Sequence, residues 1–382
     1  MSPAPEVTGT NWFQQNPKKT LALITGVALL CLVAATEKFL QFYNHRHGVF
    51  LETAPRYIRL REHRPLTRLM LPFSLNQPFR SDHVPSKKYR LTVDRDGFIM
   101  PSRKYAQPDL SLVFLGGSTT ECLFVDEENR FPYLAGVILE GMTGKKINSY
   151  NGAMSGNNSL NSIDILVNKV IPLKPRVVVF MENINDLSTL LYEGTYWNKN
   201  SSRSPVETMN KTKWLGKLLK EICIPNINYA YRNLKDALFQ DRGDEFAAAR
   251  GKKLKIDPAR LNREFAMNLE TIVNICQIRG IIPVLMTQAS RITAQPDQAV
   301  KDYFAYYLHN SGINYQDVAE AYDSFNETIR RVGRQNQVLV IDLARGVPPD
   351  ETYIYDMVHF NDTGSKYAAQ IIAARLKDRL TP

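Results

Sequence analysis

Five short apolar runs in the C-terminal two thirds of the chain constrain its fold more than any other feature. Each run is rich in apolar residues and is bounded by polar residues or glycine, which is typical of strands buried on both faces of a sheet. The runs are DLSLVFLGG (109–117), KINSYNGA (146–153), RVVVFMEN (176–183), IIPVLMTQ (281–288) and QVLVIDLA (337–344). They predict the strands of one sheet.

Segments with helical periodicity lie between and after these runs. In residues 258–280 one helical face is apolar, and Gly280 supplies a stop signal. That face comprises Leu261, Phe265, Leu269, Ile272 and Cys276. Strands that alternate with amphipathic helices indicate a parallel sheet covered on both faces. We therefore expect an α/β domain over residues 109–382, a three-layer α/β/α sandwich with a five-stranded, mainly parallel sheet.

An uncharged stretch, TLALITGVALLCLVAAT, lies between Lys19 and Glu37. Its length is near the lower end of the roughly 17–25 residues that cross a bilayer. Because aromatic residues flank it on both sides, we expect a transmembrane anchor over residues 20–40, preceded by a tail over 1–19. Two alternatives stay open, namely a signal peptide cleaved near Val33-Ala34-Ala35 and a buried core helix. Flanking basic residues nearly balance, so charge does not determine the orientation.

The net charge of +10 is concentrated in two blocks. Residues 37–108 hold 14 Lys and Arg against 6 Asp and Glu, and residues 192–260 hold 14 against 8. Such blocks suit an acidic polymer or anionic lipid headgroups, or they form a solvated surface. Because no zinc-finger, RRM-like or helix-turn-helix pattern accompanies them, we expect no nucleic-acid partner.

Two regions do not follow the alternation of strands and helices. Residues 41–108 form a basic, proline-punctuated lead-in with one expected strand and a turn at Asp96-Gly97. Residues 187–257 form an expected insertion with a polar loop, the helical piece KWLGKLLKEI and a second Lys/Arg-rich helical piece. Long insertions in α/β sheets emerge beside the carboxyl ends of the strands. Four interpretations of residues 187–257 therefore stay open: a lid, a wall of the substrate site, an element on the membrane surface, or a solvent-exposed insertion without a function.

Ser118 directly follows the first apolar run, in VFLGGSTT. Two glycines allow a sharp turn from strand to helix, which exposes a hydroxyl at the carboxyl edge of the sheet, where a developing oxyanion is stabilised. A glycine turn can also cradle phosphate, but the lysine of GxxxxGK[ST] and the spacing of GxGxxG are missing. A serine hydroxyl needs a base to become a good nucleophile.

Histidine is the natural base, and the chain has six. They are His45, His47, His63, His83, His309 and His359. The first four lie in the lead-in, which leaves His309 and His359 near the predicted strands. Asp356 precedes His359 by three residues, a spacing that brings the two side chains together so that the carboxylate can orient the imidazole. Because His45 and His47 have no carboxylate or cysteine cluster nearby and no CxxC pair occurs, we expect no metal ion.

Four blocks in this order resemble the motifs of the SGNH (GDSL-type) hydrolase family, across about residues 109–382. GGST contains Ser118, NGAMSGNNS contains Gly156, ENINDL contains Asn185, and DMVH contains Asp356 and His359. The resemblance implies a flavodoxin-like SGNH hydrolase fold with Ser118 as nucleophile, His359 as base and Asp356 as its orienter. It also implies an oxyanion hole made of the backbone N–H groups of Ser118 and Gly156 and the side-chain amide of Asn185.

Two positions depart from the family pattern. Gly117 stands where the usual GDS has an acid, and Asn183 stands where G-x-N-D has glycine. Neither belongs to the implied catalytic set. Both bear on turn geometry, and a side chain at 183 could narrow the mouth of the pocket.

The resemblance implies acyl transfer through an acyl-serine intermediate, without a metal or organic cofactor. We expect a serine esterase acting on an O-acylated glycan or envelope polymer, or on an acyl lipid. Two other functions stay open, an O-acyltransferase to polysaccharide and a catalytically silent, membrane-anchored subunit that binds glycan. The expected setting is a single-pass protein of a bacterial inner membrane with an extracytoplasmic catalytic domain, alongside envelope polysaccharide-assembly proteins.

Overall fold

The computed structural model describes most of the chain, in several stretches. They are residues 11–47, 56–73, 84–200, 203–208, 215–216, 218–224, 226–228, 231 and 252–380. The second Lys/Arg-rich piece expected in the insertion lies almost wholly outside the described residues. Contacts divide the chain into two compact units, one of residues 1–55 with 208–217 and one of residues 56–207 with 218–382.

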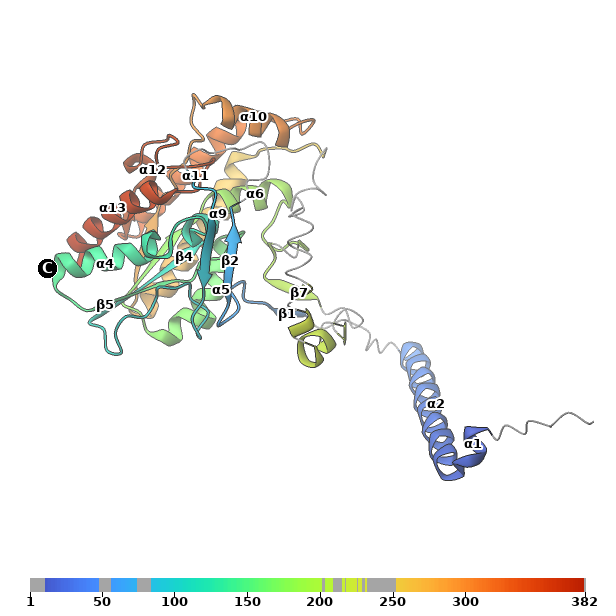
Figure 1. Ribbon diagram of the computed structural model, residues 1–382. Coiled ribbons are helices and arrows are strands. Elements are labelled where there is room, and N and C mark those ends of the chain that lie inside the picture. The colour runs from blue at the N-terminus through green and yellow to red at the C-terminus, as the bar shows by residue number, and fades with distance from the viewer. Residues whose placement is uncertain are drawn as a thin grey trace, which may run out of the picture. The chain divides into compact units, whose positions relative to one another are not determined.

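The first unit holds the apolar N-terminal stretch. Its helices are α1 Trp12–Gln15 and α2 Pro17–Arg46 (Figure 1). At about 1.5 Å per residue, the 30 residues of α2 extend for about 45 Å. None of them is buried. By length and composition α2 could cross a membrane, although a signal sequence near the N-terminus has the same properties.

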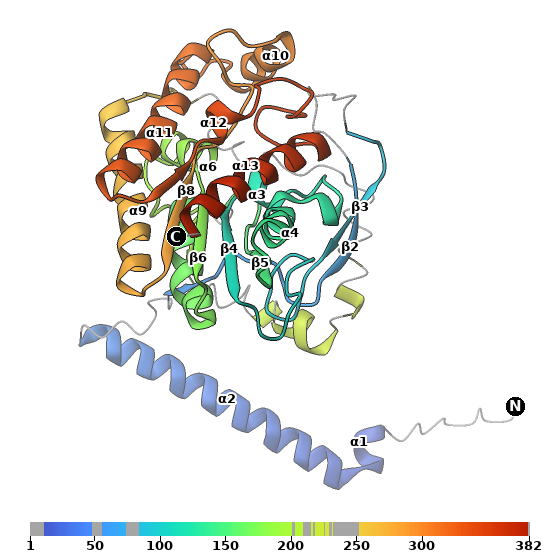
Figure 2. The same cartoon turned by 90° about the vertical axis from the view of Figure 1, so that its left-hand side faces the viewer.

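The second unit is built on a five-stranded parallel sheet in the order β5-β4-β6-β8-β9, in which Figure 2 labels β5, β4, β6 and β8. The strands are β4 Leu110–Gly116, β5 Ile147–Asn151, β6 Val177–Met181, β8 Ile282–Met286 and β9 Leu339–Ile341. Each coincides with one predicted run, so the predicted sheet is confirmed. From β4 the chain passes to β5 on one side, whereas from β6 it passes to β8 and β9 on the other side. The strand order therefore reverses between β4 and β6, and the carboxyl ends of these two strands flank that point.

Helices cover both faces of the sheet, as the alternation of patterns predicts. On one face α4 and α13 pack side by side (Figure 2), against Leu112 and Phe114 of β4. On the other face α5 packs against β4, and α9 and α11 pack against β8, in one core that includes Val113 and Leu115 of β4. These helices are α4 Phe131–Thr143, α5 Ser159–Ile165, α9 Pro258–Ile278, α11 Tyr315–Gln335 and α13 Asp362–Leu380. The apolar face predicted within α9 is buried, and Gly280 beyond its end has a φ of +70°.

The lead-in from Arg56 onward belongs to the second unit, whereas its residues 41–46 form the end of α2 in the first unit. β1 Arg56–Ile58 pairs with β7 Val206–Thr208, and β2 Arg68–Pro72 pairs antiparallel with β3 Lys88–Thr92. The strand and turn expected in the lead-in are therefore found. Ile99 forms an antiparallel bridge with Asn151 at the end of β5, which joins the lead-in to the edge of the main sheet.

The expected insertion begins inside a core helix. Leu187 and Leu190 lie in α6 Ile184–Tyr192 and are buried among residues of the main core. Beyond α6 the chain forms β7, which pairs with β1 in a separate two-stranded sheet. The segment between them carries Arg203, which is 2% exposed. This part of the insertion is therefore packed against the domain.

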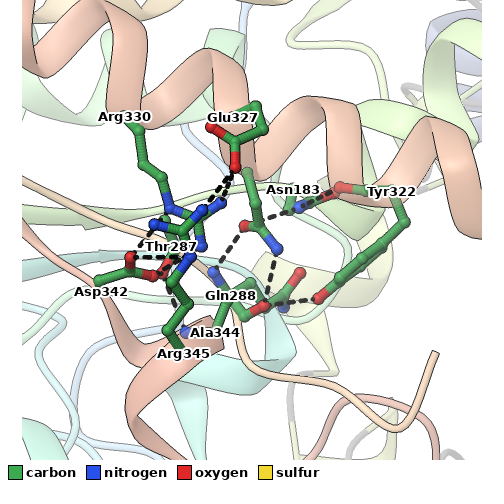
Figure 3. A network of polar contacts seen from close by, with 10 residues as sticks. Asn183, Thr287, Gln288, Tyr322, Glu327, Arg330, Asp342, Ala344 and Arg345 are labelled. Carbon is green, nitrogen blue, oxygen red and sulfur yellow. Dashed lines mark hydrogen bonds and ion pairs between the residues drawn. The ribbon is translucent and has the colours of Figure 1, made fainter. Parts of the chain in front are cut away.

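A polar network joins the carboxyl ends of β6 and β8 to α11 (Figure 3). The Asn183 side chain donates to the Tyr322 carbonyl at 3.1 Å and to Asn326 Oδ1 at 3.0 Å. Asn326 Oδ1 also accepts the N–H of Gln288 at 3.0 Å, and the Tyr322 hydroxyl donates to the Gln288 carbonyl at 3.0 Å. Asn183 is 1% exposed, so its side chain anchors β6 to α11. The expectation that it could narrow a pocket mouth is wrong.

The same network continues to β9 through charged groups (Figure 3). Arg330 binds the two carboxylate oxygens of Asp342 at 2.9 and 2.7 Å, and the Thr287 hydroxyl donates to Asp342 at 2.8 Å. Glu327 accepts from both Arg330 and Arg345. Burial raises the pKa of Asp342, but the hydrogen bonds from Arg330 and Thr287 outweigh burial and hold it below its usual value.

Candidate active site

Ser118 begins a single helical turn, α3 Ser118–Glu121, directly after β4. It is half-buried, whereas the next two residues are buried, so its hydroxyl is the accessible group of this turn. A Cβ on Gly117 would lie 2.0 Å from Asn185 Nδ2. In this conformation the Asn185 side chain occupies the space that a side chain at position 117 would fill.

A chain of hydrogen bonds links the serine, the histidine and the aspartate across 241 positions of sequence. His359 Nε2 lies 2.7 Å from Ser118 Oγ, and His359 Nδ1 lies 2.7 Å from Asp356 Oδ2. The side chains of His359 and Asp356 are 26% and 15% exposed. The predicted grouping of these three side chains is therefore present in the structure.

The loop that carries Asp356 and His359 holds both side chains by itself. Asp356 Oδ1 accepts the N–H groups of Val358 at 2.9 Å and His359 at 2.8 Å. An antiparallel bridge between Ile354 and Phe360 closes the loop. The ring of Tyr355 stacks on the imidazole, with centroids 5.7 Å apart. Because Asp356 is bonded both to the backbone and to Nδ1, it fixes the orientation of the imidazole ring.

The charges of this loop are coupled. Burial lowers the pKa of His359. The negative charge of Asp356, the hydrogen bond between Asp356 and the imidazole and the charge of Glu121 act in the opposite direction. Together they outweigh burial and raise the pKa of His359 above the ordinary value of histidine. Burial raises the pKa of Asp356, but the attraction of His359 and the backbone N–H groups outweigh it and lower the pKa. Asp356 is therefore ionised near neutral pH and favours an imidazolium.

The amide side of the site is assembled from separate segments. Asn185, in the first turn of α6, donates from Nδ2 to the Asn157 carbonyl at 2.8 Å. Gly156 precedes Asn157 and has a φ of +81°, a conformation that favours glycine. One nitrogen of Arg203 donates to the Gly156 carbonyl at 3.0 Å and to Asn185 Oδ1 at 2.8 Å. The structure thus brings Gly156 and Asn185 beside the turn that carries Ser118.

Sequence reasoning missed several polar residues here. His63 Nε2 lies 2.5 Å from Glu121 Oε1, and the Ser155 hydroxyl donates to the other oxygen of that carboxylate. The expectation that His63 lies away from the predicted strands is therefore wrong. Arg61, also from the lead-in, donates to the Ser155 carbonyl at 3.0 Å, and the sequence gives no sign of this contact because only folding brings the two segments together. His309, the alternative base, lies past α10 Gln298–Tyr307 and lines a different pocket with Leu308 and Ile313.

The arrangement is suited to nucleophilic chemistry. It presents a hydroxyl bonded to an imidazole, a carboxylate that orients this imidazole, and amide groups beside the hydroxyl. Among the residues that the structure describes, no group of three or more His, Cys, Asp and Glu side chains could hold a metal ion. A serine linked through histidine to aspartate at the edge of an α/β sheet defines the serine hydrolase class.

Within that class, comparison with protein families identifies the chain more closely. The model of the GDSL-like lipase/acylhydrolase family matches residues 114–367, and the chain belongs to this family. It is an ester hydrolase of the GDSL type. A comparison with curated protein sequences gave no match.

Solved structures with a similar fold include three from different sources. A putative GDSL-like lipase from Parabacteroides merdae is 13% identical, with a TM-score of 0.42, and the match covers 71% of this chain and 97% of that one. The acetylxylan esterase Axe2 from Geobacillus stearothermophilus is 14% identical, with a TM-score of 0.41 and coverages of 70% and 94%. LAE5, an α/β hydrolase from the metagenome of Lake Arreo, is 16% identical, with a TM-score of 0.42 and coverages of 72% and 97%.

Proposed function

We propose that the protein hydrolyses acyl esters through an acyl-enzyme formed on Ser118, with His359 as the base and Asp356 as the residue that orients it. The observation that carries the proposal is the hydrogen bond of 2.7 Å between Ser118 Oγ and His359 Nε2, continued by the bond of 2.7 Å to Asp356. A base at this distance can accept the hydroxyl proton as the oxygen attacks.

The first half of the reaction forms the acyl-enzyme. His359 Nε2 takes the proton of Ser118, whose Oγ attacks the ester carbonyl carbon to give a tetrahedral oxyanion. When this intermediate collapses, the bond to the alcohol oxygen breaks, and the imidazolium donates its proton to that oxygen. The products are the free alcohol and an ester on Ser118.

The second half releases the acid. His359 takes a proton from a water molecule, whose oxygen attacks the acyl carbon. Collapse of the second tetrahedral intermediate breaks the bond to Ser118 Oγ, which regains a proton from the imidazolium. In both halves the oxyanion is stabilised by the N–H of Ser118, the N–H of Gly156 and the Asn185 amide. An amide nitrogen has two hydrogens, so Asn185 can bind Asn157 and the oxyanion together.

For the substrate, we favour an O-acyl group on a glycan or another polar envelope polymer. The side chains that make contacts around Ser118 are polar. They are Arg61, His63, Ser155, Asn157, Asn185 and Arg203. Of these, Arg61, His63, Ser155 and Asn185 are at least partly exposed. Such polar groups suit an acyl group carried on a hydroxyl-rich polymer, whereas a long lipid chain needs an apolar channel.

For location, we favour a retained anchor formed by α2, with the catalytic unit outside the cytoplasm of a bacterium. Large apolar side chains of α2 are exposed along its length, and Trp12 and Phe39 lie near its ends, as interfacial aromatics do. The exposed thiol of Cys223 provides a test, because a membrane-impermeant maleimide reaches it in intact cells only if the catalytic unit is outside. Labelling only after lysis, with Cys223→Ser as the control, would contradict this location.

The test of function uses the full chain in detergent micelles. We expect hydrolysis of p-nitrophenyl acetate that Ser118→Ala abolishes, and release of acetate from an acetylated polysaccharide. Hydrolysis that survives Ser118→Ala at the parental rate would contradict the site. Release of fatty acid from lysophospholipid without release of acetate would contradict the substrate. Acetyl groups recovered on an added oligosaccharide rather than as acetate would identify a transferase.

A further inference from the structure

The turn that carries Gly156 is held by two arginines from segments outside the four motif blocks. Arg61, from the lead-in, donates from Nη2 to the Ser155 carbonyl at 3.0 Å and from Nε to Asn157 Oδ1 at 3.0 Å. Arg203, from the chain beyond α6, donates to the Gly156 carbonyl and to Asn185 Oδ1. Three consecutive residues of one turn are thus bonded to arginine side chains.

The bond from Arg61 fixes the direction of an N–H group. The Ser155 carbonyl and the Gly156 N–H belong to one planar, trans peptide unit and point in opposite directions. When Arg61 holds the Ser155 oxygen, the N–H of Gly156 therefore points away from Arg61. The Asn157 side chain returns a bond to the Arg61 carbonyl at 2.9 Å, which closes the contact.

The bond from Arg203 fixes the direction of the Asn185 amide. A guanidinium only donates hydrogen bonds, so the atom of Asn185 that faces Arg203 is its oxygen. The nitrogen must then face the opposite way, toward the Asn157 carbonyl and Gly117. One of its two hydrogens binds Asn157, and the second is available beside Ser118. Arg203 is 2% exposed, so water does not compete freely for these bonds.

We propose that Arg61 and Arg203 are positioning residues of the oxyanion hole, Arg61 through the N–H of Gly156 and Arg203 through both Gly156 and the amide of Asn185. The inference rests on the proposed function. It also assigns a role to the part of the insertion that carries Arg203 and to the lead-in. Both segments lie outside the four motif blocks.

The test compares substitutions in the full chain with p-nitrophenyl acetate as substrate. Arg203→Lys keeps a cation, but its side chain is one bond shorter and lacks the planar guanidinium, so its ammonium is displaced from both oxygens. We expect its kcat to fall by about ten- to a hundredfold with KM changed less than about twofold, because the hole acts on the transition state. Arg61→Met should lower kcat by about tenfold. Arg59→Met is the matched control, since Arg59 is exposed and binds Glu207 away from the turn.

A double-mutant cycle separates positioning from a merely structural role. Because Arg203 acts partly through Asn185, the loss caused by Arg203→Lys should shrink in an Asn185→Ala background, whereas the loss caused by Arg61→Met should not. The inference is overturned if Arg203→Lys keeps the parental kcat. It is also overturned if Arg203→Lys lowers kcat by the same factor in the parent and in the Asn185→Ala variant. If Arg61→Met fails to unfold cooperatively, Arg61→Lys replaces it with the same expectation. Parental activity in Ser118→Ala would instead overturn the proposed function itself.

Discussion

Two polar clusters lie at the same carboxyl edge of the sheet, and they differ in how far their side chains are exposed to solvent. In the network at the ends of β6, β8 and β9, Arg330 binds both oxygens of Asp342 and Asn183 is fully buried (Figure 3). Around β4, by contrast, Ser118 and Asn185 are partly exposed, and the Asn185 amide has a second hydrogen beyond the one that binds Asn157. The first cluster joins strands to a helix, whereas the second can meet a substrate.

The difference shows that a polar cluster at strand ends is not by itself a site. What distinguishes the proposed active site is a partly exposed serine whose hydroxyl is bonded to an imidazole. Paired charges in the other cluster have no proton to transfer near neutral pH, because Arg330 keeps Asp342 ionised. Substitutions in the two clusters should therefore affect different quantities.

The largest effect is expected from Ser118→Ala or His359→Ala. Either substitution removes one member of a unit that acts together, so kcat should fall by about 10⁴- to 10⁶-fold. Ser290, a half-buried serine after β8, provides the matched control Ser290→Ala. Initial rates with p-nitrophenyl acetate measure the loss. A comparable loss in Ser290→Ala would erase the distinction between the clusters.

Asp356→Asn should cost about 10⁴-fold in kcat. An amide at this position has no negative charge to stabilise the imidazolium. Its NH₂ group also cannot accept the hydrogen bond that the Nδ1–H group of His359 donates to Asp356. Thermal unfolding should stay cooperative, since the backbone bonds to Oδ1 can persist. A rate within about tenfold of the parent would remove Asp356 from the proposed set.

Asn185→Ala should lower kcat by about 10²- to 10³-fold, with KM little changed. The matched variant Asn185→Asp keeps an acceptor for Arg203 and removes the N–H donor, so it should lose at least as much. Steady-state kinetics of both variants test this. If Asn185→Asp were as active as the parent, the donor role assigned to Asn185 would be wrong.

The pH profile depends on the raised pKa of His359. The base must be neutral, so kcat/KM should rise with pH through a midpoint above about 6.5, the ordinary value of histidine. Its contribution to folding has the opposite sign. Because the pKa of His359 is higher in the folded than in the unfolded protein, the imidazole stabilises the fold at pH values below its unfolded pKa. This stabilisation is lost as the pH rises through its folded pKa. A midpoint below 6 would contradict the raised pKa.

The smallest effect on activity is expected from Arg330→Met. Removing the partner of Asp342 should lower the free energy of unfolding by roughly 1–3 kcal/mol, because the pair is partly buried. The value of kcat should stay within about twofold of the parent. Urea unfolding and initial rates measure the two quantities. A large loss of kcat without destabilisation would make the two clusters one functional unit.

The parts of the structure that the sequence predicts are those encoded locally. Each strand is a short run with its own pattern, and the Asp356–His359 pair is folded within one loop. The order of the motif blocks then indicates that Ser118 meets this loop. For these features, residues close in sequence carry the signal.

The parts that could not be predicted depend on contacts between distant segments. Arg61 reaches Asn157 across 96 positions and His63 reaches Glu121 across 58, and no spacing rule connects them. The Asn185 side chain fills the space beside Gly117, and nothing near Gly117 in the sequence indicates this contact. Asn183 likewise contacts α11, 139 positions away, and its sequence neighbours do not reveal this.

Trapping the acyl-enzyme tests the central claim most directly. The full chain is mixed with p-nitrophenyl acetate, quenched in acid within the first turnover and digested for mass spectrometry. The account predicts one acetyl group on the peptide that contains Ser118, and none on that peptide in Ser118→Ala. An acetyl group on a different residue, formed at the rate of turnover, would contradict it.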